Sequence, residues 1–100
     1  MIYIKEKSIE NKIKKFLELH NHYYIKVHGS VYQKVGTPDI LGCIDGRFVG
    51  IEVKQENGRP STIQIEIIEK IKKTGGLALI VYSFEDFKQF YIENFLKGNQ

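Results

Sequence analysis

Apolar residues dominate two segments, 39–44 and 47–54, and alternate with small or polar residues along both of them. The dipeptide Asp45-Gly46 separates the two segments. An Asp-Gly pair between alternating apolar segments is the strongest short-range indication of a β-hairpin with a two-residue turn. The pattern therefore predicts an antiparallel hairpin over residues 39–54.

The turn determines which residues of the two strands face each other. With Ile44 opposite Arg47, Asp39 falls opposite Glu52, and their Cβ atoms lie about 4.5–5.5 Å apart on one face. Lys54 lies two residues beyond Glu52 and points to the same face. Opposed carboxylates repel unless a cation lies between them, and Mg²⁺ takes oxygen ligands from one or two carboxylates. The open end of the hairpin is therefore a candidate metal site.

A first helix is predicted over residues 8–20, with Ser8 as its N-cap. Its apolar side recurs at helical spacing and comprises Ile9, Ile13, Phe16, Leu17 and His20. Glu10 lies at the margin of this side, next to Leu17. Its carboxylate can face the candidate site, or it can form a solvated pair with Lys14 four residues later. The sequence alone leaves both interpretations open.

The remaining pattern completes one order of elements. Residues 23–32 are rich in aromatic and β-branched residues and predict a strand, interrupted at Gly29. A helix is expected over 62–74, and the continuous apolar run 77–82 predicts a buried strand. A last helix follows Ser83. The order is helix, three antiparallel strands, helix, strand, helix, which predicts an α/β fold with helices on both faces of one mixed sheet.

Both later helices carry capping signals. Ser61 and Gln64 have the spacing of a capping box, although the amide of Gln64 can instead point to the open end of the hairpin. Ser83 and Asp86 cap the last helix. The apolar residues of that helix are expected in the core, and they are Phe84, Phe87, Phe90, Tyr91 and Leu96.

Composition adds bounds on the class of protein. The 100 residues form one expected domain, 1–100, and with 42% hydrophobic and 27% charged residues it is typical of a folded soluble protein. Cys43 is the only cysteine, which favours a reducing compartment. His20, His22 and His28 match no structural zinc pattern. A net charge of +3 permits nucleic-acid binding without demonstrating it.

With an acid at one strand start and Glu-x-Lys on the next strand, this order resembles the PD-(D/E)XK nuclease superfamily. The matching residues are Pro38-Asp39 followed by Glu52-Val53-Lys54. Within the superfamily, several features resemble the virus-type replication-repair nuclease (VRR-NUC) domain. They are the Gly-x-Pro-Asp form at 36–39, the short hairpin, the Gly58-Arg59-x-Ser61 loop and Gln64.

This resemblance implies an αβββαβ(α) restriction-endonuclease-like core and a metal-dependent, structure-selective DNA endonuclease. Such an enzyme hydrolyses phosphodiester bonds in branched DNA, at Holliday junctions or flaps, in phage or cellular replication and repair. The resemblance also implies a homodimer. We expect the protein in the cytoplasm of a bacterial or phage-infected cell, or in a eukaryotic nucleus. It is expected to be neither secreted nor in a membrane, because the sequence has no signal-peptide pattern and no apolar run of about 20 residues.

The resemblance also assigns roles to residues. The implied catalytic residues are Asp39, Glu52, Lys54 and Gln64. The implied ligands of one or two Mg²⁺ or Mn²⁺ ions are Glu10, Asp39, Glu52 and the carbonyl oxygen of Val53. Lysines and arginines near the site are candidates for contacts with the DNA backbone, and they are Lys34, Arg59 and Lys12.

Other functions remain open from the sequence. A module of the same fold could bind nucleic acid without cutting it, or could cut only with a partner. A metal-binding or interaction domain unrelated to DNA would leave Lys54 without a purpose. A nuclease of the archaeal Holliday-junction resolvase type would differ only in its substrate. Metal-dependent cleavage by the isolated chain separates a nuclease from the first alternative, and the second alternative predicts no affinity for DNA at low salt.

Overall fold

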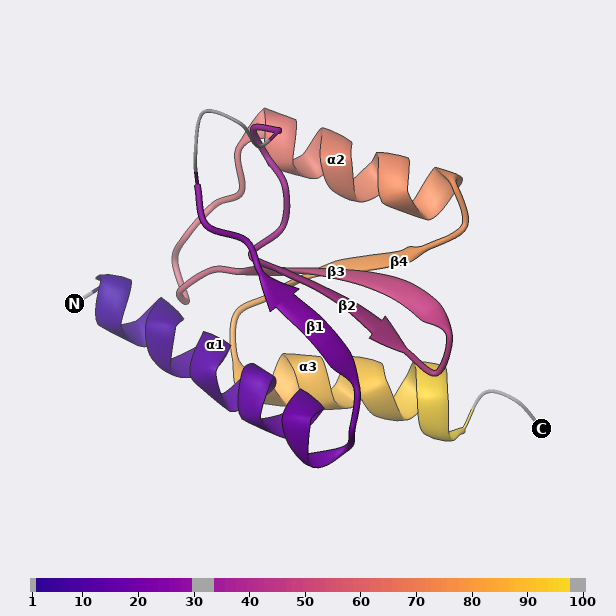
Figure 1. The fold of residues 1–100 in the computed structure, drawn as a ribbon. Helices are drawn as coiled ribbons and strands as arrows, with labels where there is room; N and C mark the ends of the chain where they lie inside the picture. Colours follow the sequence, from indigo (N-terminus) through magenta and orange to yellow (C-terminus); the bar gives the residue numbers. More distant parts are fainter. Residues whose placement is uncertain (1, 30–33, 98–100) are drawn as a thin grey trace.

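The protein is described by a computed structural model that places residues 2–29 and 34–97 (Figure 1). The helices and strands follow one another as α1 (Ile2–Leu19), β1 (Tyr23–Lys26), β2 (Ile40–Ile44), β3 (Arg47–Val53), α2 (Thr62–Lys73), β4 (Leu77–Val81), α3 (Phe84–Tyr91) and a π-helical turn, η1 (Ile92–Leu96). This order confirms the predicted α/β arrangement. None of the described helices combines the length and hydropathy that crossing a bilayer requires.

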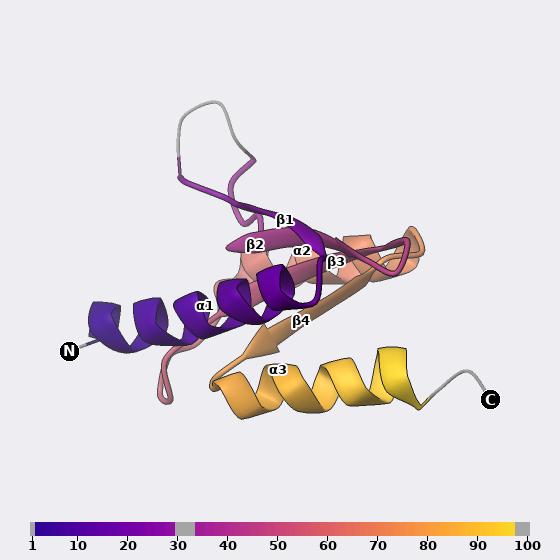
Figure 2. The same cartoon turned by 60° about the horizontal axis from the view of Figure 1, so that its bottom comes forward.

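The four strands form one mixed sheet in the order β1-β2-β3-β4. The first three strands are antiparallel neighbours, and β4 pairs with β3 in parallel. The parallel pair is possible because α2 carries the chain back across the sheet. Figures 1 and 2 show α2 on one face of the sheet and both α1 and α3 on the other.

The strand pleat divides the side chains between these two faces. Val49, Ile51 and Val53 of β3 are buried in the main core, together with Ile13 and Leu17 of α1. The alternate residues of β3 point to the opposite face, where a Cβ at Gly50 would lie 3.2 Å from the Ile71 side chain of α2. Glu52 lies two residues after Gly50, so its side chain points to the same face of the sheet, which α2 covers.

Both predicted helix caps are confirmed. Ser61 Oγ accepts the backbone N–H of Gln64 at 3.1 Å, and Gln64 Oε1 accepts the backbone N–H of Ser61 at 2.9 Å, which is a complete capping box. Ser83 Oγ accepts the backbone N–H of Asp86 at 3.1 Å. These side chains satisfy backbone donors that have no partner within the first turn of a helix.

Two predicted boundaries are wrong. The first helix begins at Ile2, so Ser8 lies inside α1 and is not its N-cap. A tertiary contact anchors the additional turns, because Glu6 Oε2 accepts the backbone N–H of Gln55 at 3.1 Å. The strand β1 ends at Lys26, well before residue 32, and residues 30–33 lie outside the described part of the chain.

Two residues expected on apolar helix faces are exposed. His20 lies beyond the end of α1 and is exposed, although its ring still packs against Phe16, with the ring centroids 4.3 Å apart. Leu96 belongs to η1 and is 60% exposed, since that turn extends past the end of the core. The other aromatic residues of the last helix pack as expected, with Phe87 and Tyr91 buried.

Candidate active site

The hairpin has the register that its turn sequence predicts. Ile44 pairs with Arg47 and Ile40 with Ile51, so the next step of the same register places Asp39 opposite Glu52. Asp45 and Gly46 both have positive φ, 49° and 82°, which is the conformation of a type I′ turn. The two carboxylates thus meet at the open end of the hairpin, as predicted.

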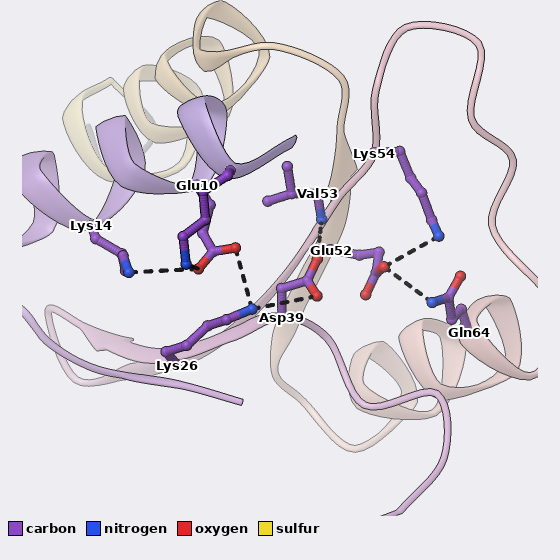
Figure 3. A network of polar contacts seen from close by, with 9 residues as sticks. Glu10, Lys14, Lys26, Asp39, Glu52, Val53, Lys54 and Gln64 are labelled. Carbon is purple, nitrogen blue, oxygen red and sulfur yellow. Dashed lines mark hydrogen bonds and ion pairs between the residues drawn. The ribbon is translucent and has the colours of Figure 1, made fainter. Parts of the chain in front are cut away.

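Asp39 is fixed by backbone contacts on both sides. Its Oδ2 accepts the N–H of Val53 at 2.8 Å, and its backbone carbonyl accepts the N–H of Val27 at the same distance. Pro38, directly before it, is fully buried. The second carboxylate oxygen of Asp39, Oδ1, lies 3.8 Å from Nζ of Lys26 (Figure 3). The strand end therefore holds this carboxylate in place before any ligand arrives.

Glu52 is the most deeply buried acid of the hairpin, at 3% exposure. Its Oε2 accepts Nε2 of Gln64 at 3.1 Å and lies 3.6 Å from Nζ of Lys54. Its Oε1 is buried and has no hydrogen-bond partner among the described residues. Gln64 thus fulfils both interpretations that the sequence left open, because one end of its amide caps α2 and the other holds Glu52 (Figure 3).

The environment of Glu52 opposes its negative charge. Burial, followed by repulsion from Asp39, raises the pKa of Glu52 to about 7, although Lys54 acts in the opposite direction. A carboxyl group with this pKa is partly protonated at neutral pH. A cation bound beside it would favour the ionised form and would lower its pKa again.

Glu10 faces the site from α1 and is also paired on its own helix. It is 6% exposed, and its Oε2 lies 3.5 Å from Nζ of Lys14 and 4.0 Å from Nζ of Lys7. Its Oε1 lies 3.2 Å from Nζ of Lys26, which also approaches Asp39. The pair with Lys14 is therefore formed, but it is not the solvated pair of the second interpretation, because the carboxylate of Glu10 is buried beside the site.

Sequence reasoning missed Lys26 and Glu6. Lys26 pairs with Ile40 in the sheet, so it lies one step from Asp39, but the sequence does not fix the register between β1 and β2. Glu6 approaches the site from α1, one turn before Glu10, and contributes to the raised pKa of Glu52. The helical spacing of Glu6 and Glu10 was the available signal for this second acid.

The donors at the site suit a hard divalent cation. Oε1 of Glu52 is a buried carboxylate oxygen without a hydrogen-bond partner in the described chain, and Asp39 lies beside Glu52. Oε2 of Glu10 is also buried and has only the ion pairs with Lys14 and Lys7. Within residues 2–29 and 34–97, no three His, Cys, Asp or Glu side chains are gathered closely enough to form a metal cage by themselves. The arrangement fits Mg²⁺ or Mn²⁺ held by Asp39 and Glu52 and completed by other oxygen ligands.

The other predicted residues lie around the carboxylates or on other parts of the surface. The N–H of Val53 is used by Asp39, and a role for its carbonyl oxygen as a ligand stays a prediction. Lys34 lines a hollow that also includes Asp39, whereas Arg59 and Lys12 line two other hollows of the surface. Lys34 is therefore the basic residue of this predicted set that adjoins the carboxylates.

Comparison with solved structures identifies the fold. A structure described as a VRR_NUC domain superposes with a TM-score of 0.76 and 28% sequence identity, over 91% of this chain and 97% of the other. The chain is a VRR-NUC domain. A second structure, described as a VRR_NUC domain protein, matches this VRR-NUC domain with a TM-score of 0.71 and 21% identity, over 89% and 88% of the two chains.

A curated relative also resembles the VRR-NUC domain. The Holliday junction resolvase RecU of Mycoplasmopsis pulmonis (strain UAB CTIP) is 31% identical over an alignment of 80 residues, and the match covers 74% of this chain. The aligned region is 51% of that relative, so the chain spans about half of its length. No profile of a known protein family matches the sequence.

Proposed function

We propose that this VRR-NUC domain is a metal-dependent, structure-selective endonuclease that hydrolyses phosphodiester bonds in branched DNA, at Holliday junctions or flaps. The observation that carries the proposal is the meeting of Asp39 and Glu52 at the open end of the hairpin, with Lys54 3.6 Å from Glu52. Similarity to a relative named as a Holliday junction resolvase supports a four-way junction as the first substrate to test.

In this proposal Asp39 and Glu52 hold Mg²⁺ or Mn²⁺. The bound ion would lower the pKa of a water molecule and offset the charge of the attacked phosphate. Lys54 is a compact charge with three donors, so its ammonium can orient the water or stabilise charge that develops on the phosphate. Gln64 is best placed as a positioning residue, because its amide is already used by Ser61 and Glu52.

DNA would be held mainly through its backbone. Lys34 lines the same hollow as Asp39 and would contact the phosphates that flank the cut, whereas Arg59 and Lys12 would contact more distant ones. A homodimer would present two such sites to two strands of one junction. A monomeric mass in light scattering at micromolar concentration would remove the dimer from this proposal.

The test is cleavage of labelled linear duplex, flap and four-way-junction DNA with Mg²⁺, Mn²⁺ or EDTA. Two variants remove one carboxylate charge each, Asp39→Asn and Glu52→Gln, and asparagine at 39 can still accept the N–H of Val53. Glu66→Gln makes the same chemical change at an exposed position of α2 and serves as the control.

We expect metal-dependent cutting by the wild type and by Glu66→Gln, and none by the two site variants. Wild-type cutting rates in Asp39→Asn would refute the assignment of the site. Tight binding of junctions without cutting, in every metal, would favour the alternative of a non-catalytic or partner-dependent module of the same fold.

A further inference from the structure

Lys26 has no role in the proposed hydrolysis, yet its ammonium group lies between two of the predicted metal ligands. Its Nζ is 3.2 Å from Oε1 of Glu10 and 3.8 Å from Oδ1 of Asp39 (Figure 3). The side chain is only 21% exposed. The ammonium therefore fills, at least in part, the position of a cation that joins the two carboxylates.

The pairing of β1 with β2 places Lys26 at this position. The Cα atoms of Lys26 and Ile40 are partners in the β1–β2 ladder, and the next backbone N–H, of Val27, donates to the carbonyl of Asp39. Lys26 shares the row of Ile40 and Ile51, which are buried on the face covered by α1. Its side chain consequently reaches Glu10 on one side and the end of β2 on the other.

We propose that Lys26 is a resident counter-ion of the site, with which a divalent metal ion must compete for the carboxylate of Asp39. The inference rests on the proposed function, because it concerns the same metal. Two carboxylates held near each other require a neutralising cation, and an ammonium with three donors can serve both. A divalent ion on Asp39 would repel that ammonium across a few ångströms, so the two cations exclude each other.

The contacts around Lys26 allow it to be displaced. Oε2 of Glu10 would still have Lys14 at 3.5 Å and Lys7 at 4.0 Å. Oδ2 of Asp39 would still accept the N–H of Val53. Neither carboxylate therefore loses all its partners when Lys26 moves away. Lys26 stabilises the arrangement without metal and, by the same contacts, weakens binding of the metal.

Lys14 provides a matched control for this idea. It also pairs with Glu10 and is 23% exposed, close to the value for Lys26, but no ion pair joins it to Asp39. Lys26→Met and Lys14→Met remove the same charge from the same neighbourhood. A difference in metal affinity between the two variants indicates direct competition at Asp39. An equal change in affinity indicates only the electrostatic potential of the whole site.

The experiment is titration calorimetry of the full chain with Mn²⁺ and with Ca²⁺, without DNA. We expect Lys26→Met to bind the ion at least tenfold more tightly than the wild type, and Lys14→Met to change affinity less than threefold. Lys26→Arg keeps the charge and should remain within threefold of the wild type. Melting curves of each variant verify that it is folded, and Lys26→Gln replaces any variant that is not.

The outcomes separate this inference from the nuclease proposal. Equal tightening in Lys26→Met and Lys14→Met would overturn the inference, as would weaker binding in Lys26→Met. If wild-type binding is lost in Glu52→Gln but unaffected by Lys26→Met, only the counter-ion role fails. If neither the wild type nor Lys26→Met binds either ion, the inference and the metal chemistry of the proposed function fail together.

Discussion

Gln64 joins the first turn of α2 to Glu52 through the two ends of one amide group. Its Oε1 accepts the backbone N–H of Ser61 at 2.9 Å, and its Nε2 donates to Oε2 of Glu52 at 3.1 Å. The start of the helix and the orientation of the buried carboxylate therefore depend on the same side chain. Loss of Gln64 should affect the stability of the fold and the proposed reaction together.

Substitution of Gln64 can be compared with that of its capping partner. Gln64→Ala should lower the free energy of unfolding by about 1 kcal/mol and also lower the cleavage rate, because Glu52 loses a fixed donor. Ser61→Ala should have a similar effect on stability with near wild-type cleavage. Urea unfolding and junction cleavage measure the two quantities. Full activity in Gln64→Ala would show that the contact with Glu52 is not needed.

The raised pKa of Glu52 predicts how stability depends on pH without metal. The pKa of Glu52 is about 7 in the folded protein, against 4.5 for an unperturbed glutamate, so between these values the folded protein keeps a proton that the unfolded chain has released. The contribution of Glu52 to the free energy of unfolding should therefore fall as pH rises from 4.5 to about 7, and stay constant above it.

Glu52→Gln removes this dependence. In EDTA, the free energy of unfolding of Glu52→Gln relative to the wild type should rise by about 3 kcal/mol as pH increases through the same interval. Denaturant unfolding at several pH values measures it, and Glu66→Gln should show no such trend. A difference between Glu52→Gln and the wild type that does not change with pH would contradict the raised pKa.

Lys54→Met should separate catalysis from metal binding. The ammonium lies 3.6 Å from Oε2 of Glu52 and is expected to act on water or phosphate, not to ligate the ion. We expect cleavage to fall by about 10²–10³-fold, as when one preorganised donor is removed, while Mn²⁺ affinity is retained or increased. Single-turnover cleavage and calorimetry provide the two readings. Loss of metal binding in Lys54→Met would assign this lysine a different role.

Gly50 lets the segment before Asp39 approach the sheet closely. A Cβ at this position would lie 3.1 Å from Cγ of Pro38 and 3.2 Å from Cδ1 of Ile71. Gly50→Ala should therefore lower the free energy of unfolding by about 1–3 kcal/mol. It should also reduce cleavage, because Pro38 directly precedes Asp39 and a shift of Pro38 would move that carboxylate. Gly29→Ala is the control, because its added Cβ would have nothing within 4 Å. Thermal melts and cleavage assays of both variants test this, and equal stability of the two would refute the close packing.

The sequence predicts the central pair of the site but not its surroundings. Asp45-Gly46 fixes a short-range register, so the opposition of Asp39 and Glu52 follows from counting residues. Lys26 depends on the register of β1 against β2, which a long connection joins and no turn signal fixes. Glu6 depends on a contact between α1 and Gln55, and such tertiary contacts have no local signature.

The same distinction explains the errors at the boundaries. The helical pattern located the buried stretch of α1 correctly, because Ile13 and Leu17 are in the core. Residues before Ser8 continue the helix partly because the rest of the protein provides a partner for Glu6. Helix propensity and hydrophobic periodicity are properties of a segment by itself. The residues at which the segment begins and ends also depend on its tertiary contacts.

The division of the site between layers has a mechanical consequence. Asp39 directly precedes β2 and Glu52 lies in β3, the strand paired with β2, and the N–H of Val53 in β3 donates to the carboxylate of Asp39. Their spacing is therefore as rigid as the sheet itself. Glu10 lies on α1, which contacts the sheet through side chains of the core and through the ion pair of Glu10 with Lys26. A force applied to α1, such as a bent DNA arm pressing on it, would move Glu10, whereas Asp39 and Glu52 would keep their separation.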